Sequence, residues 1–264
     1  MTTLPKTSNC ILELSDGWLT IWFNRPEKRN ALSTELFKDI EITLKSVYSD
    51  HSIRGIIFRG KGNMFCAGAD LEELKNISSA GEKARAMAME MSNCAGEVFK
   101  AISTTPQITV AAVEGAAMAG AFGIACATDL LVTMADAKYA LTETKIGLTP
   151  AQIAPYVLNR LGFAKARKLM ILGTSFNGQK AFEMSMADYV ANNEKEFNDQ
   201  LNDIKKQGNK CAPHAVSVTK KIIYNNHDID FKKAAILFSD CIVHKEGKEG
   251  FASFFEKRRP YWNK

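Results

Sequence analysis

Buried strands alternate with amphipathic helices along most of this 264-residue chain, and glycine closes each strand. This pattern limits the possible folds more than any other feature. A hairpin is expected over residues 10–24, because two alternating apolar runs flank Asp16-Gly17, a strong tight-turn signal. Buried strands are expected at 53–60 and 106–115, and one or two more within 129–141. Strands that alternate with helices predict an α/β fold.

Helical patterns fill the gaps between these strands and then replace them. Apolar residues at helical spacing, Leu36, Ile40, Leu44 and Val47, predict a helix after the hairpin, and 80–102 is helix-rich. From residue 194 only helices are expected, at 194–206, 212–224, 230–243 and 246–257. The chain is therefore predicted to contain an α/β core over 1–193 and a helical segment over 194–264.

Composition excludes several classes of protein. The chain is 46% hydrophobic and 24% charged, as in ordinary globular proteins. No apolar run approaches the roughly 18 residues of a membrane span, and the start lacks a basic region followed by an apolar run, so we expect a cytoplasmic protein. The net charge of +5 is a mild bias, typical of a solvated surface or of a site for a polyanionic small ligand. Its basic residues are dispersed, which argues against nucleic acid.

Cysteine spacing gives no sign of a metal site. None of the six cysteines forms a CxxC pair, and the four histidines do not cluster with them. Most of the thiols are expected to be small buried groups in a reducing compartment. A nucleophilic cysteine is a less favoured alternative.

Two stretches of small residues could present backbone N–H groups to a ligand. The first, NMFCAGADLEEL at 63–74, follows a predicted strand; its alternative is a plain turn with Asp70 capping the next helix. The second, GAAMAGAFGIACATDL at 115–130, is predicted to form a loop over 115–123 that leads into a helix. It lacks the usual phosphate-binding glycine motifs. Two roles remain for its small residues: stabilising an oxyanion through backbone N–H groups, or allowing close helix packing.

Glu143 is the carboxylate best placed for chemistry. It follows a predicted strand and precedes Gly147 and Pro150, so it lies in or beside a turn. Such a carboxylate is usually just solvated. In an apolar setting its pKa would rise, and it could then exchange protons with a ligand.

Five segments resemble the enoyl-CoA hydratase/isomerase family, also called the crotonase family. They are NRPEKRNALS, FCAGADL, GAAMAGAFGIACATDL, DAKYALTETKIGLTP and FFEKRRP, and they occur in family order over residues 24–260. The resemblance implies a crotonase-like core of repeated ββα units and a helical C-terminal segment that builds a homotrimer or a dimer of trimers. It also implies an acyl-CoA thioester as ligand.

The resemblance assigns roles to individual residues. The N–H groups of Ala69 and Gly120 are implied to hold the thioester oxygen of an enolate, and Glu143 to act as general acid and base. Small residues fit such a hole, since bulky side chains would block it. The implied CoA-binding residues are Lys28, Arg29, Ala31, Ala67, Asp70 and Leu71, together with Phe238 and Lys257 from a neighbouring subunit.

Two positions depart from the family pattern. Typical hydratases carry a second glutamate where Gly123 stands, and a lysine often found after the position of Leu71 is replaced by Glu72. We interpret Gly123 as opening space for a bulkier or branched acyl chain; the alternative is that it only permits close packing. The replacement at Glu72 weakens one expected phosphate contact.

The sequence therefore predicts an enoyl-CoA hydratase. The resemblance is greatest to hydratases of glutaconyl-type CoA esters, including methylglutaconyl-CoA and isohexenylglutaconyl-CoA, which belong to leucine and acyclic-terpene breakdown. A double-bond isomerase with Glu143 as its single proton shuttle is the first alternative, and a non-catalytic acyl-CoA binding protein is the second. No metal or redox cofactor is implied, because coenzyme A enters as part of the substrate. No nucleic-acid or membrane partner is expected.

Overall fold

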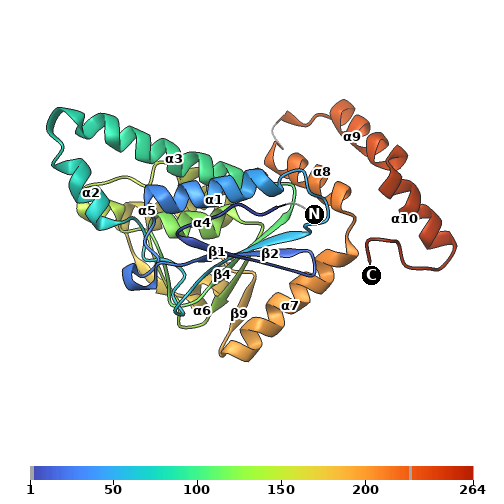
Figure 1. Ribbon diagram of the computed structural model, residues 1–264, viewed down its shortest axis with the longest axis horizontal. Coiled ribbons are helices and arrows are strands. Elements are labelled where there is room, and N and C mark those ends of the chain that lie inside the picture. Colours follow the sequence, from blue (N-terminus) through green and yellow to red (C-terminus); the bar gives the residue numbers. More distant parts are fainter. Residues whose placement is uncertain (1–2, 226–227, 264) are drawn as a thin grey trace.

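A six-stranded sheet forms the centre of the computed structural model, which describes residues 3–225 and 228–263. Its strand order is β1-β2-β3-β4-β6-β9 (Figure 1). The strands are β1 (Cys10–Ser15), β2 (Trp18–Phe23), β3 (Gly55–Gly60), β4 (Ile108–Val113), β6 (Leu130–Met134) and β9 (Tyr189–Ala191). The predicted hairpin is confirmed, since β1 and β2 pair antiparallel around Asp16-Gly17. The remaining neighbours pair in parallel.

A second, three-stranded sheet corrects one expectation. It contains β5 (Ala116–Met118), β7 (Lys138–Ala140) and β8 (Ser175–Asn177). The loop predicted over 115–123 is therefore wrong: β5 and the start of a helix occupy that stretch. Three residues of Ala and Met are too few to show a strand pattern, and β5 exists because it pairs with β7.

Four helices cover one face of the large sheet (Figure 1). They are α1 (Thr34–Val47), α3 (Ala84–Thr104), α4 (Gly120–Ala127) and α5 (Ala154–Leu172). The apolar stripe predicted on α1 is confirmed, because Leu36, Ile40, Leu44 and Val47 are all buried. Shorter elements complete the core: α2 (Leu71–Ser78), α6 (Gly178–Glu183), and the 3₁₀ turns η1 (Pro26–Lys28), η2 (Gly81–Lys83) and η3 (Glu143–Ile146).

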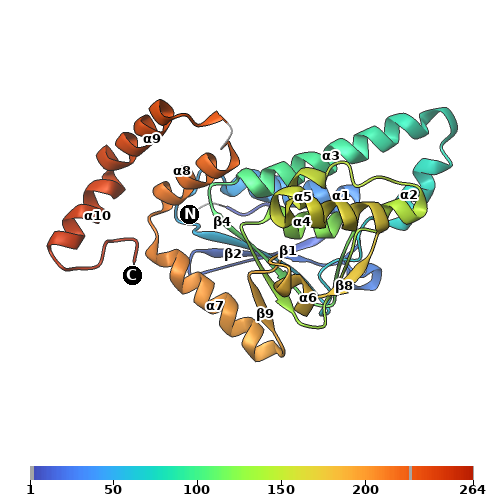
Figure 2. The ribbon, with the colours of Figure 1, turned by 180° about the vertical axis from the view of Figure 1, so that it is seen from behind.

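The C-terminal part contains α7 (Glu194–Lys210), α8 (Pro213–Tyr224), α9 (Phe231–Val243) and α10 (Lys245–Phe255). Helix α7 covers the other face of the sheet, where Phe197, Leu201 and Ile204 pack with Trp18 and Ile57. By contrast, α9 has no buried residue. Helices α9 and α10 project from the end of the molecule opposite α2 (Figures 1 and 2).

Polar contacts tie the C-terminal part to the first strands. Trp18 Nε1 donates to Asn209 Oδ1 at 2.9 Å. Arg54 donates to the carbonyls of Gly208 and Cys211, and also to that of Trp262 at 3.3 Å. None of the described helices is long and apolar enough to cross a bilayer.

Candidate active site

Parallel pairing brings the two small-residue stretches together. Cys66 and Ala117 form a parallel bridge: Cys66 N donates to Ala116 O at 2.9 Å, and Met118 N donates to Cys66 O at 3.2 Å. Ala69 and Gly120 each lie three residues beyond a member of this bridge. The register therefore places them at matching positions on neighbouring segments.

The N–H groups of Ala69 and Gly120 share a second property. Among the hydrogen bonds of the described residues, neither N–H finds an acceptor, although those of Asp70 and Ala119 beside them do. Asp70 N donates to Leu32 O, and Ala119 N donates to Ala140 O, both at 2.9 Å. Two unused donors at matching positions are the requirement for binding an oxyanion, and they cost no reorganisation when charge develops.

The backbone is strained immediately before Gly120. Ala119 has φ 49° and ψ −119°, a conformation that non-glycine residues rarely adopt. Two hydrogen bonds hold it, from its own N–H to Ala140 O and from Gly123 N to Ala119 O at 3.2 Å. On the facing segment Gly68 has φ +96°, and a Cβ there would lie 3.0 Å from Met118 O. These conformations fix the directions of the neighbouring N–H groups.

Glu143 begins η3 close to this pair. Ala119 N donates a hydrogen bond to Ala140 O, and Glu143 follows Ala140 by three residues. The Cα atoms of Ala140 and Glu143 are therefore at most about 11 Å apart. The Oε2 atom of Glu143 is buried and has no hydrogen-bond partner among the described residues. Burial raises the pKa of this carboxyl above its ordinary value. A carboxyl with a free oxygen and a raised pKa is equipped to exchange protons with a ligand.

Gly123 lies in the first turn of α4, and the space beside it is closed. A Cβ there would lie 2.1 Å from Ile153 Cγ2 and 2.7 Å from Ile153 Cβ. Our interpretation that Gly123 opens room for an acyl chain is therefore wrong, because Ile153 fills that room. Close packing, the alternative, is what the structure shows. Ile153 was missed because nothing in its local pattern indicates which helix it contacts.

The first group of expected CoA residues surrounds the loop after β2. Lys28 and Arg29 lie at the end of η1, and Ala67 N donates to Arg29 O at 3.0 Å, which joins this loop to the segment of Ala69. Ala31 O accepts from Arg25 at 2.6 Å. Leu71, the first residue of α2, is 72% exposed and thus accessible to a ligand.

Asp70 has a clear structural role. It caps α2 by accepting from Glu72 N at 3.0 Å, which confirms the capping alternative, and it pairs with Arg25 at 2.8 Å. Burial favours a higher pKa for this carboxyl, but these partners outweigh burial and hold the pKa below its usual value. Its contact with CoA stays a prediction.

Glu72 does more than replace a lysine. Its carboxylate pairs with Lys28 Nζ at 2.9 Å, and both side chains are exposed. Glu72 therefore pairs with Lys28, one of the residues expected to bind CoA.

Phe238 and Lys257 are far from the other candidates. Phe238 lies on α9 and is 70% exposed; Lys257 follows α10 and is also exposed. Both helices lie at the end of the molecule opposite α2 (Figure 1). Within one chain the structure does not bring these two residues to Ala69 and Gly120.

The buried cysteines are poor nucleophile candidates. Cys10, Cys66 and Cys126 are buried, Cys94 and Cys241 are half-buried, and Cys211 is exposed, so the expectation that most are buried is wrong. Burial raises the pKa of Cys66 and of Cys126 to about 12, which leaves both as neutral thiols.

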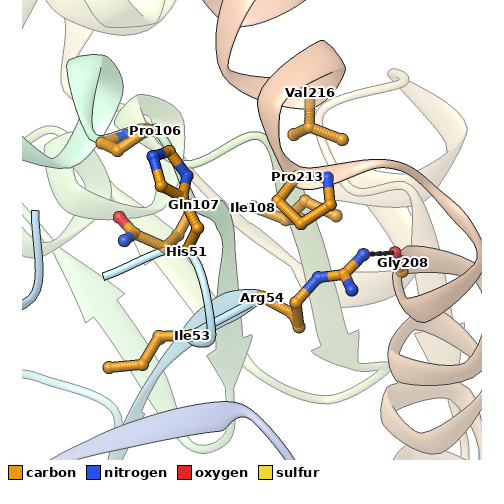
Figure 3. A pocket seen from close by; sticks show the side chains of 9 residues that line it. All are labelled: His51, Ile53, Arg54, Pro106, Gln107, Ile108, Gly208, Pro213 and Val216. Carbon is orange, nitrogen blue, oxygen red and sulfur yellow. Dashed lines mark hydrogen bonds between the residues drawn. The ribbon is translucent and has the colours of Figure 1, made fainter. Parts of the chain in front are cut away.

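A small cavity at the amino ends of β3 and β4 is not a substrate site. Figure 3 shows Arg54, Gln107 and Pro213 among its lining residues, on the opposite end of these strands from Ala69. Its volume of about 10 Å³ accommodates one water molecule. This cavity is therefore too small to hold an acyl thioester.

An α/β core that presents two unused backbone donors and a half-buried glutamate with an unpartnered oxygen has the groups needed for acyl-thioester chemistry. Comparison with known proteins agrees: the family model "Enoyl-CoA hydratase/isomerase" matches residues 13–264. The chain belongs to this family, and it is an enzyme of the crotonase type.

Individual relatives resemble the chain over nearly its whole length. A putative enoyl-CoA hydratase of Thermus thermophilus is 30% identical, with 95% of this chain and 99% of that protein covered. The solved structure of Pseudomonas aeruginosa AtuE has a TM-score of 0.93 at 32% identity, covering 97% of this chain and 100% of that one. An enoyl-CoA hydratase/isomerase from Marinobacter aquaeolei has a TM-score of 0.92 at 33% identity, with 97% and 99% covered.

Proposed function

We propose that this protein hydrates an enoyl-CoA thioester and that Glu143 is its general acid and base. Support comes from the unpartnered, buried Oε2 of Glu143 beside two unused N–H groups. The N–H groups of Ala69 and Gly120 hold the thioester oxygen, which becomes negative as the enolate forms. Fixed backbone donors stabilise this charge more than the neutral carbonyl, and that difference lowers the barrier.

One carboxyl can account for both proton transfers. The Glu143 carboxylate takes a proton from water as the water oxygen bonds to the β-carbon, and the double-bond electrons move to the thioester oxygen. The protonated Glu143 then returns a proton to the α-carbon as the enolate collapses. The net change is addition of one water molecule. The raised pKa of Glu143 favours the second step, because it holds the proton more tightly than a solvated glutamate would.

The proposed substrate is a branched or glutaconyl-type enoyl-CoA. This rests on the family resemblance. The packing of Ile153 against Gly123 leaves no place there for a second carboxylate, and it supports the glutaconyl-type ester alone. A carboxylate on the acyl chain could then orient the water. Binding of the CoA part is assigned to Lys28, Arg29, Ala31, Ala67, Asp70 and Leu71.

The site is proposed to be completed by a neighbouring subunit in a homotrimer or a dimer of trimers. Phe238 lies on α9 and Lys257 follows α10, helices that project from the end of the molecule opposite α2, and α9 exposes its apolar residues. A cytoplasmic location and the absence of a metal or redox cofactor stay predictions.

Double-bond isomerisation is the second candidate, because a single glutamate suffices to move one proton between carbons. The packing of Ile153 on Gly123 favours it as much as it favours a one-carboxylate hydratase. Non-catalytic acyl-CoA binding is the remaining alternative.

One experiment separates all three. The protein is incubated in ¹⁸O-labelled water with a panel of straight, branched and glutaconyl-type enoyl-CoA esters. Mass spectrometry then gives the masses of the products. Hydration adds one labelled water and isomerisation adds none. CoA esters that bind without turnover on the whole panel would contradict the proposal and favour the binding protein.

A further inference from the structure

Leu32 contacts both segments that carry the candidate oxyanion donors. Its N–H donates to Gly68 O at 2.7 Å, and its carbonyl accepts from Asp70 N at 2.9 Å. These two bonds flank Ala69, so the backbone of Leu32 fixes the residues on either side of that donor. Leu32 itself is only 3% exposed.

The side chain of Leu32 extends to the other donor. A Cβ built on Gly120 would lie 3.0 Å from Leu32 Cδ1, so the isobutyl end fills the space beside Gly120. The first turn of α4 is restrained at a second point, because Ile153 packs against Gly123. Ile153 is branched at Cβ, which restricts its χ1 rotamers, so its contact with Gly123 restrains α4.

This contact matters because the ladder between the two segments stops short of the donors. Its last hydrogen bond joins Met118 N to Cys66 O. Beyond it, among the described residues, no hydrogen bond links 68–69 to 119–120. Packing contacts therefore act on the gap: a Cβ on Gly68 would lie 3.0 Å from Met118 O, and one on Gly120 would lie 3.0 Å from Leu32 Cδ1. An oxyanion hole needs both donors within about 2.7–3.1 Å of one oxygen.

We propose that Leu32 is a positioning residue that sets the separation between the N–H groups of Ala69 and Gly120. The inference rests on the proposed oxyanion hole. Shortening the side chain leaves the backbone bonds around Ala69 intact and releases Gly120. One donor then stays in place while the other moves away from the thioester oxygen.

The test compares Leu32→Ala with Leu32→Met, which keeps the reach of the side chain, and with Leu44→Ala as a matched control. Leu44 is 2% exposed and lies on α1. Two quantities are measured: kcat and KM on the ester that the wild type turns over fastest, and the infrared carbonyl frequency of bound butyryl-CoA labelled with ¹³C at the thioester. The frequency reports how strongly both donors polarise the carbonyl.

Leu32→Ala is expected to lower kcat by about 10- to 10²-fold, less than the 10²- to 10³-fold loss of a whole donor. KM should change by less than about threefold, and the carbonyl frequency should return part of the way to its value in water. Leu32→Met and Leu44→Ala should both stay close to wild type. If Leu32→Ala does not fold, Leu32→Val, which removes the Cδ atoms, is judged by the same criteria.

Two results would overturn the inference in different ways. Equal effects of Leu32→Ala and Leu44→Ala on kcat and on the carbonyl frequency would show that Leu32 only packs in the core. The proposed oxyanion hole would be unaffected by that result. A wild-type protein that leaves the carbonyl frequency unshifted would remove the oxyanion hole itself, and with it both the proposed function and the role of Leu32.

Discussion

Helices α4 and α9 are both apolar, and they differ in what covers them. In α4 every residue from Ala121 to Ala127 is buried, and the helix packs between the sheet and its neighbouring helices. In α9 no residue is buried, and Phe231 and Phe238 are among the exposed residues. The α4 region is thus completed within one chain, whereas the α9 region offers an apolar surface that this chain does not cover. The predictions below probe this contrast.

The largest effect is expected where the chain completes its own site. Glu143→Gln keeps the shape of the side chain and removes proton exchange, so kcat should fall by about 10²- to 10⁴-fold while CoA-ester affinity stays nearly constant. Steady-state kinetics and calorimetric titration measure the two quantities. Glu183→Gln, at an exposed position paired with Lys180, is the control. Near-wild-type turnover by Glu143→Gln would refute its role.

The next effect concerns the uncovered region. A chain that ends at Asn225 lacks α9 and α10 and keeps α7, which the sheet needs because Phe197 and Leu201 cover Trp18. We expect this truncation to fold, to lose the oligomer and to bind CoA esters more weakly, because Phe238 and Lys257 are gone. Sedimentation and titration test this. A monomer in both full-length and truncated protein, with equal affinities, would contradict the assembly proposal.

Adding one methyl group compares the two regions directly. Gly123→Ala should destabilise the fold by about 1–3 kcal/mol, because its Cβ overlaps Ile153. Gly250→Ala in α10 should be neutral or stabilising by up to about 1 kcal/mol, since its Cβ would make an ordinary 3.6 Å contact with Trp262. Denaturant unfolding gives both values. Ile153→Ala should partly rescue Gly123→Ala, and absence of rescue would mean that another contact is limiting.

A smaller effect links the site to stability. Burial raises the pKa of Glu143, so the charged carboxylate costs stability at neutral pH, and this cost disappears as pH falls through the raised pKa. Glu143→Gln should therefore have a higher Tm than wild type at pH 7, and the difference should shrink towards pH 4.5. Equal Tm differences at both pH values would show that Glu143 is solvated rather than buried.

The smallest effect is expected at the exposed pair of Lys28 and Glu72. Glu72→Gln frees Lys28 for a phosphate, and CoA affinity should rise by no more than about fivefold, as is typical of a surface ion pair. The gain should disappear in high salt. Calorimetry at two salt concentrations measures it. A fall in affinity would show that Glu72 itself contacts the ligand.

Local patterns predicted much of the fold. The Asp16-Gly17 turn, the stripe on α1 and the four C-terminal helices could be predicted because each depends on residues close in sequence. Strand β5 could not, because it exists only through pairing with β7.

The candidate site likewise contains residues that the sequence could predict and contacts that it could not. Ala69, Gly120 and Glu143 were found from the family pattern, and the structure adds the unused N–H groups and the buried oxygen of Glu143. The contact of Gly123 with Ile153 joins α4 to the residue that caps α5, thirty positions further along the chain. Such contacts depend on how helices pack, which no single segment specifies. The interpretation of Gly123 failed for this reason.

The attachment of the last helices to the first strands has a consequence for the time course of folding. Trp18 and its partner Asn209 are 191 residues apart, and Arg54 and the Trp262 carbonyl are 208 apart. A ribosome that adds about 5–20 residues per second needs about 10–40 s to make the chain between Trp18 and Asn209. Until α7 emerges, one face of the new sheet, with Trp18, Ile57 and Val110, has no cover. The nascent chain therefore exposes this apolar face from the time β4 is made until α7 is complete.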